Sequence, residues 1–205
     1  MLRRLTVALL VAAPLTLPGI VQAQGDSLPP RTRLGLAAVS AVSVNVGFAS
    51  IQRGYHGLAI GTTVDFGHLM SSRIRLLADV GYLHTFPKTE FVQSENRSYR
   101  DVFRDLTGTL ALSLHPNAPS SRFSPYAETG LGIHILSSSF GTLAVDRRYN
   151  TNNFGILLGG GARLRLGSSG RRALLVEVRR VLSQDVGRTS VHVGLAALFG
   201  ELAPR

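Results

Sequence analysis

The chain has no cysteine and no tryptophan among its 205 residues, and Lys88 is its single lysine. Without cysteine there is no disulfide, no thiolate metal ligand, no thiol nucleophile and no site for a lipidated N-terminal cysteine. Charged residues make up only 17% of the chain, whereas aliphatic residues are plentiful and accompany 22 glycines. A length of this order suits one domain, and the low charge favours a membrane protein over a soluble one.

The formal net charge is +10 at pH 7. Phosphate contacts in nucleic-acid complexes need lysine and arginine, but such proteins usually gather them on one element with interleaved aromatic residues. Here the basic residues are spread along the whole chain. We therefore expect no nucleic-acid partner, and we expect the exposed arginines to meet the phosphates of an anionic lipid or lipopolysaccharide headgroup, whose geometry suits the guanidinium fork.

The first 23 residues have the pattern of a secretory signal peptide. Arg3 and Arg4 precede an apolar stretch over 5–21, and Val-Gln-Ala ending at Ala23 fits the small-x-small cleavage rule. Two prolines interrupt the stretch, which disfavours a permanent membrane anchor. Beyond Ala23 no run approaches the roughly 18 continuous apolar residues that a spanning helix needs. If the mature chain enters a membrane, it must do so as a closed barrel, because closed sheets satisfy every backbone polar group in hydrocarbon.

After an entry segment at 24–31, hydrophobicity alternates with period two, as in β-strands. Each segment is about as long as a tilted membrane-spanning strand, or somewhat longer. Short Gly-, Pro- and Ser-rich turns largely alternate with longer polar connections, which is typical of outer-membrane barrels, although the connections 50–55 and 183–188 are short. The pattern predicts eight strands, at 34–49, 56–67, 71–85, 100–115, 124–137, 153–166, 172–182 and 189–199, with long loops at 86–99 and 138–152.

Separating each segment by parity gives two faces with different chemistry, because successive side chains of a strand point to opposite sides. One face is almost purely apolar. It contains Leu34, Leu36, Val42, Val44, Val46, Phe48, Leu58, Ile60, Val64, Phe66, Ile74, Leu76, Val80, Tyr82, Leu106, Leu110, Leu112, Leu114, Leu131, Ile133, Ile135, Phe154, Ile156, Leu158, Leu164, Leu166, Leu174, Val176, Val178, Val191, Val193, Leu195 and Phe199.

The other face contains glycines, small residues and an equal number of acids and arginines. An eight-stranded barrel has an interior that side chains just fill, so these charges are expected to pair there. The predicted lumenal salt-bridge network consists of Asp65, Arg73, Arg75, Asp79, Asp105, Glu128, Arg163, Arg165, Glu177 and Arg179. A secreted soluble barrel that binds an apolar ligand would reverse the two faces, and periodicity alone does not say which face is inside.

Three segments resemble strands of the OmpA/OmpX-like outer-membrane β-barrel domain family. Residues 124–132 (SPYAETGLG) are similar to its PYxxxGxG strand, and residues 153–163 and 175–179 resemble the two strands that follow. The resemblance covers about 32–199 and implies an eight-stranded barrel with an occluded polar interior. Family members commonly end on an aromatic residue that the assembly machinery recognises, whereas here Phe199 is followed by six more residues.

Six histidines invite a search for catalysis, because some small outer-membrane barrels modify lipids with a histidine and a serine or carboxylate. His134, with Ser137 or Ser138 as nucleophile and Glu128 as orienter, is the best candidate. A rim histidine at the membrane interface is the simpler interpretation. No two histidines share a strand face at i, i+2, so we expect no metal site and no cofactor. The Gly159-Gly160-Gly161 run lies within a strand and is expected to allow close packing.

The sequence thus predicts an all-β, eight-stranded antiparallel up-and-down transmembrane barrel after a signal peptide. Its expected organisation is a signal peptide at 1–23, a periplasmic entry segment at 24–31, a barrel at 32–199 and a tail at 200–205. We expect a non-enzymatic, monomeric protein of the bacterial outer membrane that meets the barrel-assembly machinery. Its expected role is structural or surface contact, or that of a narrow pore. The alternatives are a lipid-modifying enzyme centred on His134 and a soluble ligand-binding barrel.

Overall fold

The structure is a computed structural model that describes residues 39–52, 54–69, 71–94, 96–117, 121–141, 146–167, 169–183, 187–199 and 202. All of these lie in one compact unit, Leu34–Arg205. The predicted signal peptide and entry segment, Leu34 and Leu36, and most of the predicted tail lie outside the described residues.

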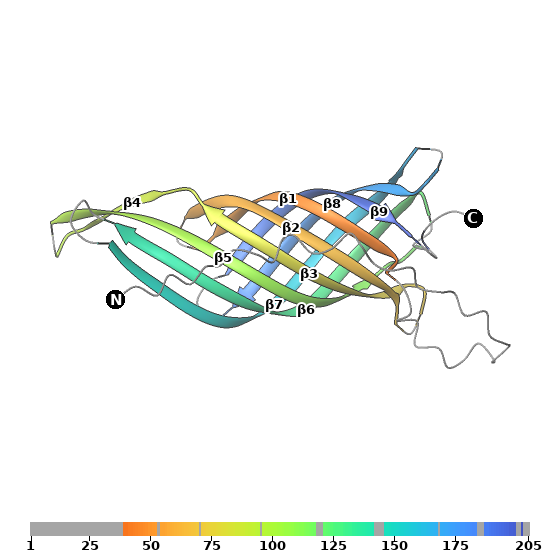
Figure 1. The fold of residues 1–205 in the computed structure, drawn as a ribbon, viewed down its shortest axis with the longest axis horizontal. Coiled ribbons are helices and arrows are strands. Elements are labelled where there is room, and N and C mark those ends of the chain that lie inside the picture. The colour runs from red at the N-terminus through yellow and green to blue at the C-terminus, as the bar shows by residue number, and fades with distance from the viewer. Residues whose placement is uncertain are drawn as a thin grey trace, which may run out of the picture. The chain divides into compact units, whose positions relative to one another are not determined.

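Nine antiparallel strands account for most of the described residues (Figure 1). They are β1 (Ala41–Ile51), β2 (Tyr55–His68), β3 (Ile74–Thr85), β4 (Lys88–Val92), β5 (Arg97–Leu114), β6 (Phe123–Gly141), β7 (Asp146–Leu166), β8 (Arg172–Ser183) and β9 (Arg188–Leu198). Within the described residues, no helix has the length and hydrophobicity needed to cross a bilayer.

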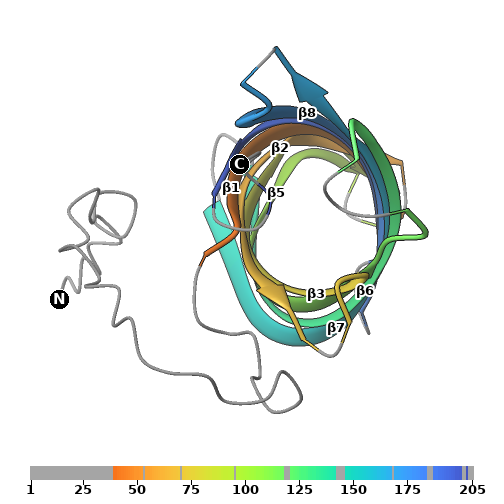
Figure 2. The same cartoon turned by 90° about the vertical axis from the view of Figure 1, so that its right-hand side faces the viewer.

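Eight of these strands form a closed barrel. Each of the eight pairs with its neighbour, β1 pairs with β9, and β3 pairs with β5, so the sheet closes without β4 (Figure 2). The prediction of an eight-stranded antiparallel barrel is therefore confirmed. The end of the barrel at which β2 meets β3, β5 meets β6 and β7 meets β8 is called the turn end, and the opposite end is the loop end.

Two of the long loops expected from the sequence are largely strand. Residues 138–141 and 146–152 continue the β6–β7 ladder, and β4 pairs with the first residues of β5 inside the expected loop 86–99. These segments are rich in polar residues, a composition that predicts irregular structure. A hairpin needs only paired backbone groups, so polar strands are stable where both faces meet water. The β4–β5 hairpin and the β6–β7 hairpin project beyond the barrel wall at the loop end (Figure 1).

Burial alternates along every strand of the barrel wall, and it settles which face is inside. The predicted apolar face points outward: Leu131 is 69% exposed and Phe154 is 81% exposed. The predicted polar face points inward, with Asp65, Glu128 and Glu177 all nearly inaccessible. The arrangement is opposite to that of a soluble barrel, in which apolar side chains surround the interior.

The lumen also holds apolar side chains, in addition to the small and charged residues predicted for the inward face. Leu175, Leu198 and Leu202 pack with three alanines near the turn end, and Ile51, Tyr55 and Leu83 pack with Ala49 near the loop end. Leu202 belongs to the predicted tail, follows β9 and is 1% exposed. A third apolar cluster, Leu77, Ala111, Leu157 and Val181, is also buried, so apolar clusters and buried charged residues both occur along the length of the lumen.

Candidate functional site

The centre of the lumen is organised around Arg179 of β8. Its Nη1 lies 3.1 Å from Asp79 Oδ2, its Nε lies 2.9 Å from Glu128 Oε1 and its Nη2 lies 3.1 Å from Glu177 Oε2. The Thr63 hydroxyl donates a further hydrogen bond of 2.8 Å to Asp79. All four charged side chains are buried, so each depends on the others for the stabilisation that water would otherwise provide.

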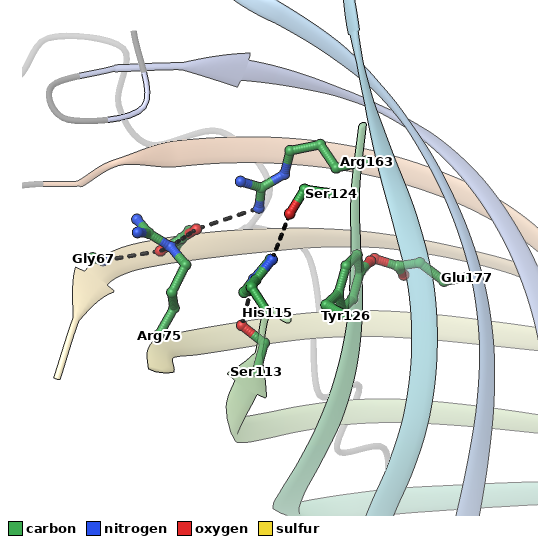
Figure 3. A network of polar contacts seen from close by, with 9 residues as sticks. Gly67, Arg75, Ser113, His115, Ser124, Tyr126, Arg163 and Glu177 are labelled. Atoms are coloured by element: carbon green, nitrogen blue, oxygen red, sulfur yellow. Dashed lines mark hydrogen bonds and ion pairs between the residues drawn. The ribbon is translucent and has the colours of Figure 1, made fainter. Parts of the chain in front are cut away.

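A second cluster lies at the turn end of the lumen (Figure 3). Arg75 Nε donates to both oxygens of Asp65, at 3.1 and 2.8 Å, and Arg163 Nη2 donates to Asp65 at 3.4 Å. The backbone N–H of Gly67 donates to the same carboxylate at 2.9 Å. Arg75 is 1% exposed and Asp65 is 3% exposed, so this pair is fully withdrawn from solvent.

His115 lies beside this cluster, one residue beyond the end of β5. Its Nδ1 lies 2.9 Å from Ser124 Oγ and its Nε2 lies 3.2 Å from Ser113 Oγ, which holds the ring between two hydroxyls. Burial, followed by the charges of Arg163 and Arg75, lowers the pKa of His115 to about 4. The ring is therefore neutral at physiological pH and serves as one donor and one acceptor.

A third cluster lies toward the loop end. Asp105 Oδ2 accepts from Arg188 Nη1 at 2.6 Å and lies 3.0 Å from His134 Nδ1. Nearby, the Tyr55 hydroxyl donates to Asp101 at 2.9 Å, and Lys88 Nζ lies 4.8 Å above the Tyr55 ring. The buried charge thus extends from one end of the barrel wall to the other.

The structure brings eight of the ten predicted network residues into these three clusters. Arg73 lies before β3 and is exposed, and Arg165 is half-buried at the end of β7. The residues that join the clusters without having been predicted as members include Asp101, His115, His134 and Arg188. Arg188 falls in an expected connection between strands. It lies two residues before Ser190, so it has the inward parity of the last strand, and a longer predicted strand would have placed it in the lumen.

Little space remains between these side chains. In two lumenal cavities that described residues line, the volume is about 20 Å³ each. One lies near Asn45, Asp79 and Arg179, and the other lies near Asp65, His115 and Arg163. A cavity of this size has room for a single water molecule. The ring of ribbon seen in Figure 2 is therefore filled by side chains along this part of the lumen.

The arrangement predicted for a His134-centred enzyme is not assembled. Asp105, not Glu128, contacts His134, and Glu128 lies six residues away along β6, about 20 Å for an extended strand. Ser137 has the opposite parity, so it faces outward while His134 faces the lumen, and Ser138 lies four residues along β6 from His134, about 13 Å for an extended strand. His134 is only 4% exposed. The His134 ring is thus held inside the lumen by the Asp105 carboxylate.

Comparison with known proteins identifies the fold. No protein-family model and no curated protein matches the sequence. Among solved structures, Neisserial surface protein A matches with a TM-score of 0.52 at 12% identity, over 78% of this chain and 96% of that one. A major outer membrane protein from Thermus thermophilus also matches with a TM-score of 0.52 at 12% identity, over 79% of this chain and 100% of that one. The fold is that of small outer-membrane β-barrels.

In this outer-membrane barrel fold, the exposed apolar band is bordered by polar residues at both ends. At the turn end the border consists of exposed arginines, namely Arg73, Arg122, Arg171 and Arg172. At the loop end two rows of register partners form the border. His56, Ser50, Thr189 and Arg180 lie across β2, β1, β9 and β8, and His84, Arg104 and Ser137 lie across β3, β5 and β6.

Proposed function

We propose that the mature protein spans the outer membrane of a bacterium and contributes to envelope integrity or surface contact without conducting solutes. The observation that carries this proposal is the outward band of large aliphatic and aromatic side chains between two polar borders. Lipid acyl chains solvate such a band, while headgroups and water solvate the borders. In plain water the same band would be an exposed apolar surface far larger than soluble monomers present.

The packed lumen supports a closed barrel over a narrow pore. Arg179 contacts three carboxylates, and each of the two cavities around the network holds about one water molecule. A conducting path would require these pairs to separate, which is costly in a low-dielectric interior. We therefore assign the charged network a structural role: it fills the barrel and fixes its shape.

The same geometry supports an orientation and a set of partners. We propose that the turn end faces the periplasm and that the projecting hairpins, β4–β5 and β6–β7, face outward, as is usual for barrels with short periplasmic turns. Outer-membrane lipid and lipopolysaccharide are the proposed contacts of the wall, and the barrel-assembly machinery is the proposed partner during insertion. We propose a monomer, because the barrel closes on itself through β3 and β5.

Membrane fractionation combined with gel migration tests this proposal. We expect the mature chain in the outer-membrane fraction, with a folded band that shifts after boiling, and we expect no steady conductance in planar bilayers. Recovery of the chain as a dispersed monomer in detergent-free buffer would overturn the membrane assignment. Steady single-channel currents from the wild-type protein would overturn the closed barrel.

The enzymatic alternative has its own test. Lipid A from cells that express the wild-type chain is compared by mass spectrometry with lipid A from cells that express His134→Ala. Because His134 is buried against Asp105, we expect identical lipid A masses. A mass shift that appears with the wild-type chain and is absent with His134→Ala would establish a lipid-modifying enzyme instead.

A further inference from the structure

Three polar residues form a compact patch on the outer wall, where the apolar band meets the loop end. His84 of β3 lies directly opposite Arg104 of β5, and Arg104 lies directly opposite Ser137 of β6. All three have the outward parity of their strands, and His84 and Arg104 are exposed. We call these three residues the rim patch.

The rim patch is continuous with lipid-facing wall on its turn-end side. The next outward row on the same three strands consists of Tyr82, Leu106 and Ile135, which are paired in the same order. These side chains are 41%, 41% and 47% exposed. An acyl chain that packs along this row would bring the polar end of its lipid to the level of the rim patch.

The donors of the rim patch are available to an external ligand. Within the part of the chain that the structure describes, neither the His84 nor the Arg104 side chain has a hydrogen bond or an ion pair. Arg180, in the other loop-end border row, differs because its Nη1 donates to Thr189 Oγ1 at 2.7 Å. Arg104 therefore presents a complete guanidinium fork beside an imidazole and a hydroxyl, a donor set that matches the oxygens of a phosphate group.

We propose that the rim patch binds the phosphate group of an anionic lipid whose acyl chains lie on Tyr82, Leu106 and Ile135. This inference rests on the proposed membrane location and names a lipid class and a site for it. Arg104 is the principal ligand, because it is the residue of the three that carries a permanent charge, and it lies between the other two in the ladder. His84 and Ser137 add one donor each.

The test uses the mature chain refolded in octyl glucoside, a detergent without phosphate. Native mass spectrometry counts bound lipid during titration with phosphatidic acid, and with diacylglycerol of the same acyl chains as the uncharged comparison. We expect wild-type protein to retain phosphatidic acid in preference to diacylglycerol. Arg104→Gln should bind phosphatidic acid about tenfold more weakly, as expected for losing a charged hydrogen-bond donor. Arg97→Gln is the matched control, since Arg97 is also an exposed arginine of β5 but lies in the projecting hairpin.

Three results would overturn the inference: no preference for phosphatidic acid in the wild type, unchanged binding by Arg104→Gln, or an equal loss in Arg97→Gln. Full competition by millimolar inorganic phosphate would show that acyl chains are unnecessary, and would overturn the assignment to a lipid. A heat-modifiable gel band, recorded for each variant, shows whether the barrel has folded, independently of whether it binds lipid. Failure of the wild type to form that band counts against the membrane barrel itself, whereas a folded barrel without lipid preference counts only against the rim patch.

Discussion

Arg179 Nε lies 2.9 Å from Glu128 Oε1 at the centre of the barrel, although the two residues belong to strands separated by β7. Both side chains are buried, and Arg179 also contacts Asp79 and Glu177. One guanidinium therefore links carboxylates from β3, β6 and β8 across the lumen. This link makes the interior a cross-brace between opposite parts of the wall.

Removing that guanidinium should weaken the barrel severely. In Arg179→Met three buried carboxylates lose their shared cation, so we expect a loss of about 3–5 kcal/mol in the free energy of unfolding. Arg172→Met, on the same strand but exposed, should change it by less than about 0.5 kcal/mol. Because the chain lacks tryptophan, urea unfolding in lipid vesicles is followed by far-UV circular dichroism. Similar losses in the two variants would contradict the assigned role of Arg179.

Gly159 of β7 leaves room for the Glu128 side chain. A Cβ added at Gly159 would lie 2.7 Å from Glu128 Oε1 and 3.1 Å from the Val178 carbonyl oxygen. We expect Gly159→Ala to displace Glu128 from Arg179 and to cost about 1–3 kcal/mol. Gly108→Ala is the control, because a Cβ there meets nothing within 4 Å. The same vesicle unfolding assay compares the two, and equal stability would show that the lumen accommodates the methyl group.

His115 should make part of the stability depend on pH. Its pKa is about 4 in the folded barrel, against an ordinary value of 6.5, so the unfolded chain binds a proton more readily than the folded one between these two values. Above about pH 7, His115 protonation has no effect on the free energy of unfolding. As the pH falls from 6.5 toward 4, the preference of the unfolded chain for the proton lowers that free energy, and below pH 4 the effect levels off. His115→Gln keeps polar contacts but does not titrate. The stability advantage of wild type over His115→Gln should shrink by a few kcal/mol across this window. A difference that stays constant with pH would contradict the buried neutral histidine.

The outward apolar band should not tolerate charge. Leu131 of β6 is 69% exposed and faces acyl chains in the proposed membrane location. Leu131→Arg should destabilise the folded state in phosphatidylcholine vesicles by about 2–4 kcal/mol, as expected for a guanidinium near the bilayer midplane. Thr89→Arg, on the projecting β4, should have little effect because Thr89 lies beyond the barrel wall in water. If both substitutions are harmless, lipid does not contact Leu131.

The projecting hairpins show that polar composition alone does not distinguish a loop from a pair of strands. Residues 146–152 are aspartate, arginine, tyrosine, asparagine and threonine, a composition that predicts a loop. They pair with β6 because a hairpin already in register extends at little cost once its first rungs are fixed. The sequence signal for that extension is weak, since neither face of the projecting strands is required to be apolar.

The sequence by itself determined the number of strands in the wall and the chemistry of their two faces. Because side chains alternate with period two, the sequence alone fixes which of them share a face of a strand, and it places Leu131 and Glu128 on opposite faces. Closure of the barrel decided the rest. The pairing of carboxylates with arginines depends on the register between strands and on which strands face each other across the lumen. Arg179 and Asp79 are an example, since they are in contact although 100 residues separate them in the sequence. The same closure brought Arg188, His115 and Leu202 inside, since their positions depend on where each strand ends relative to its neighbours.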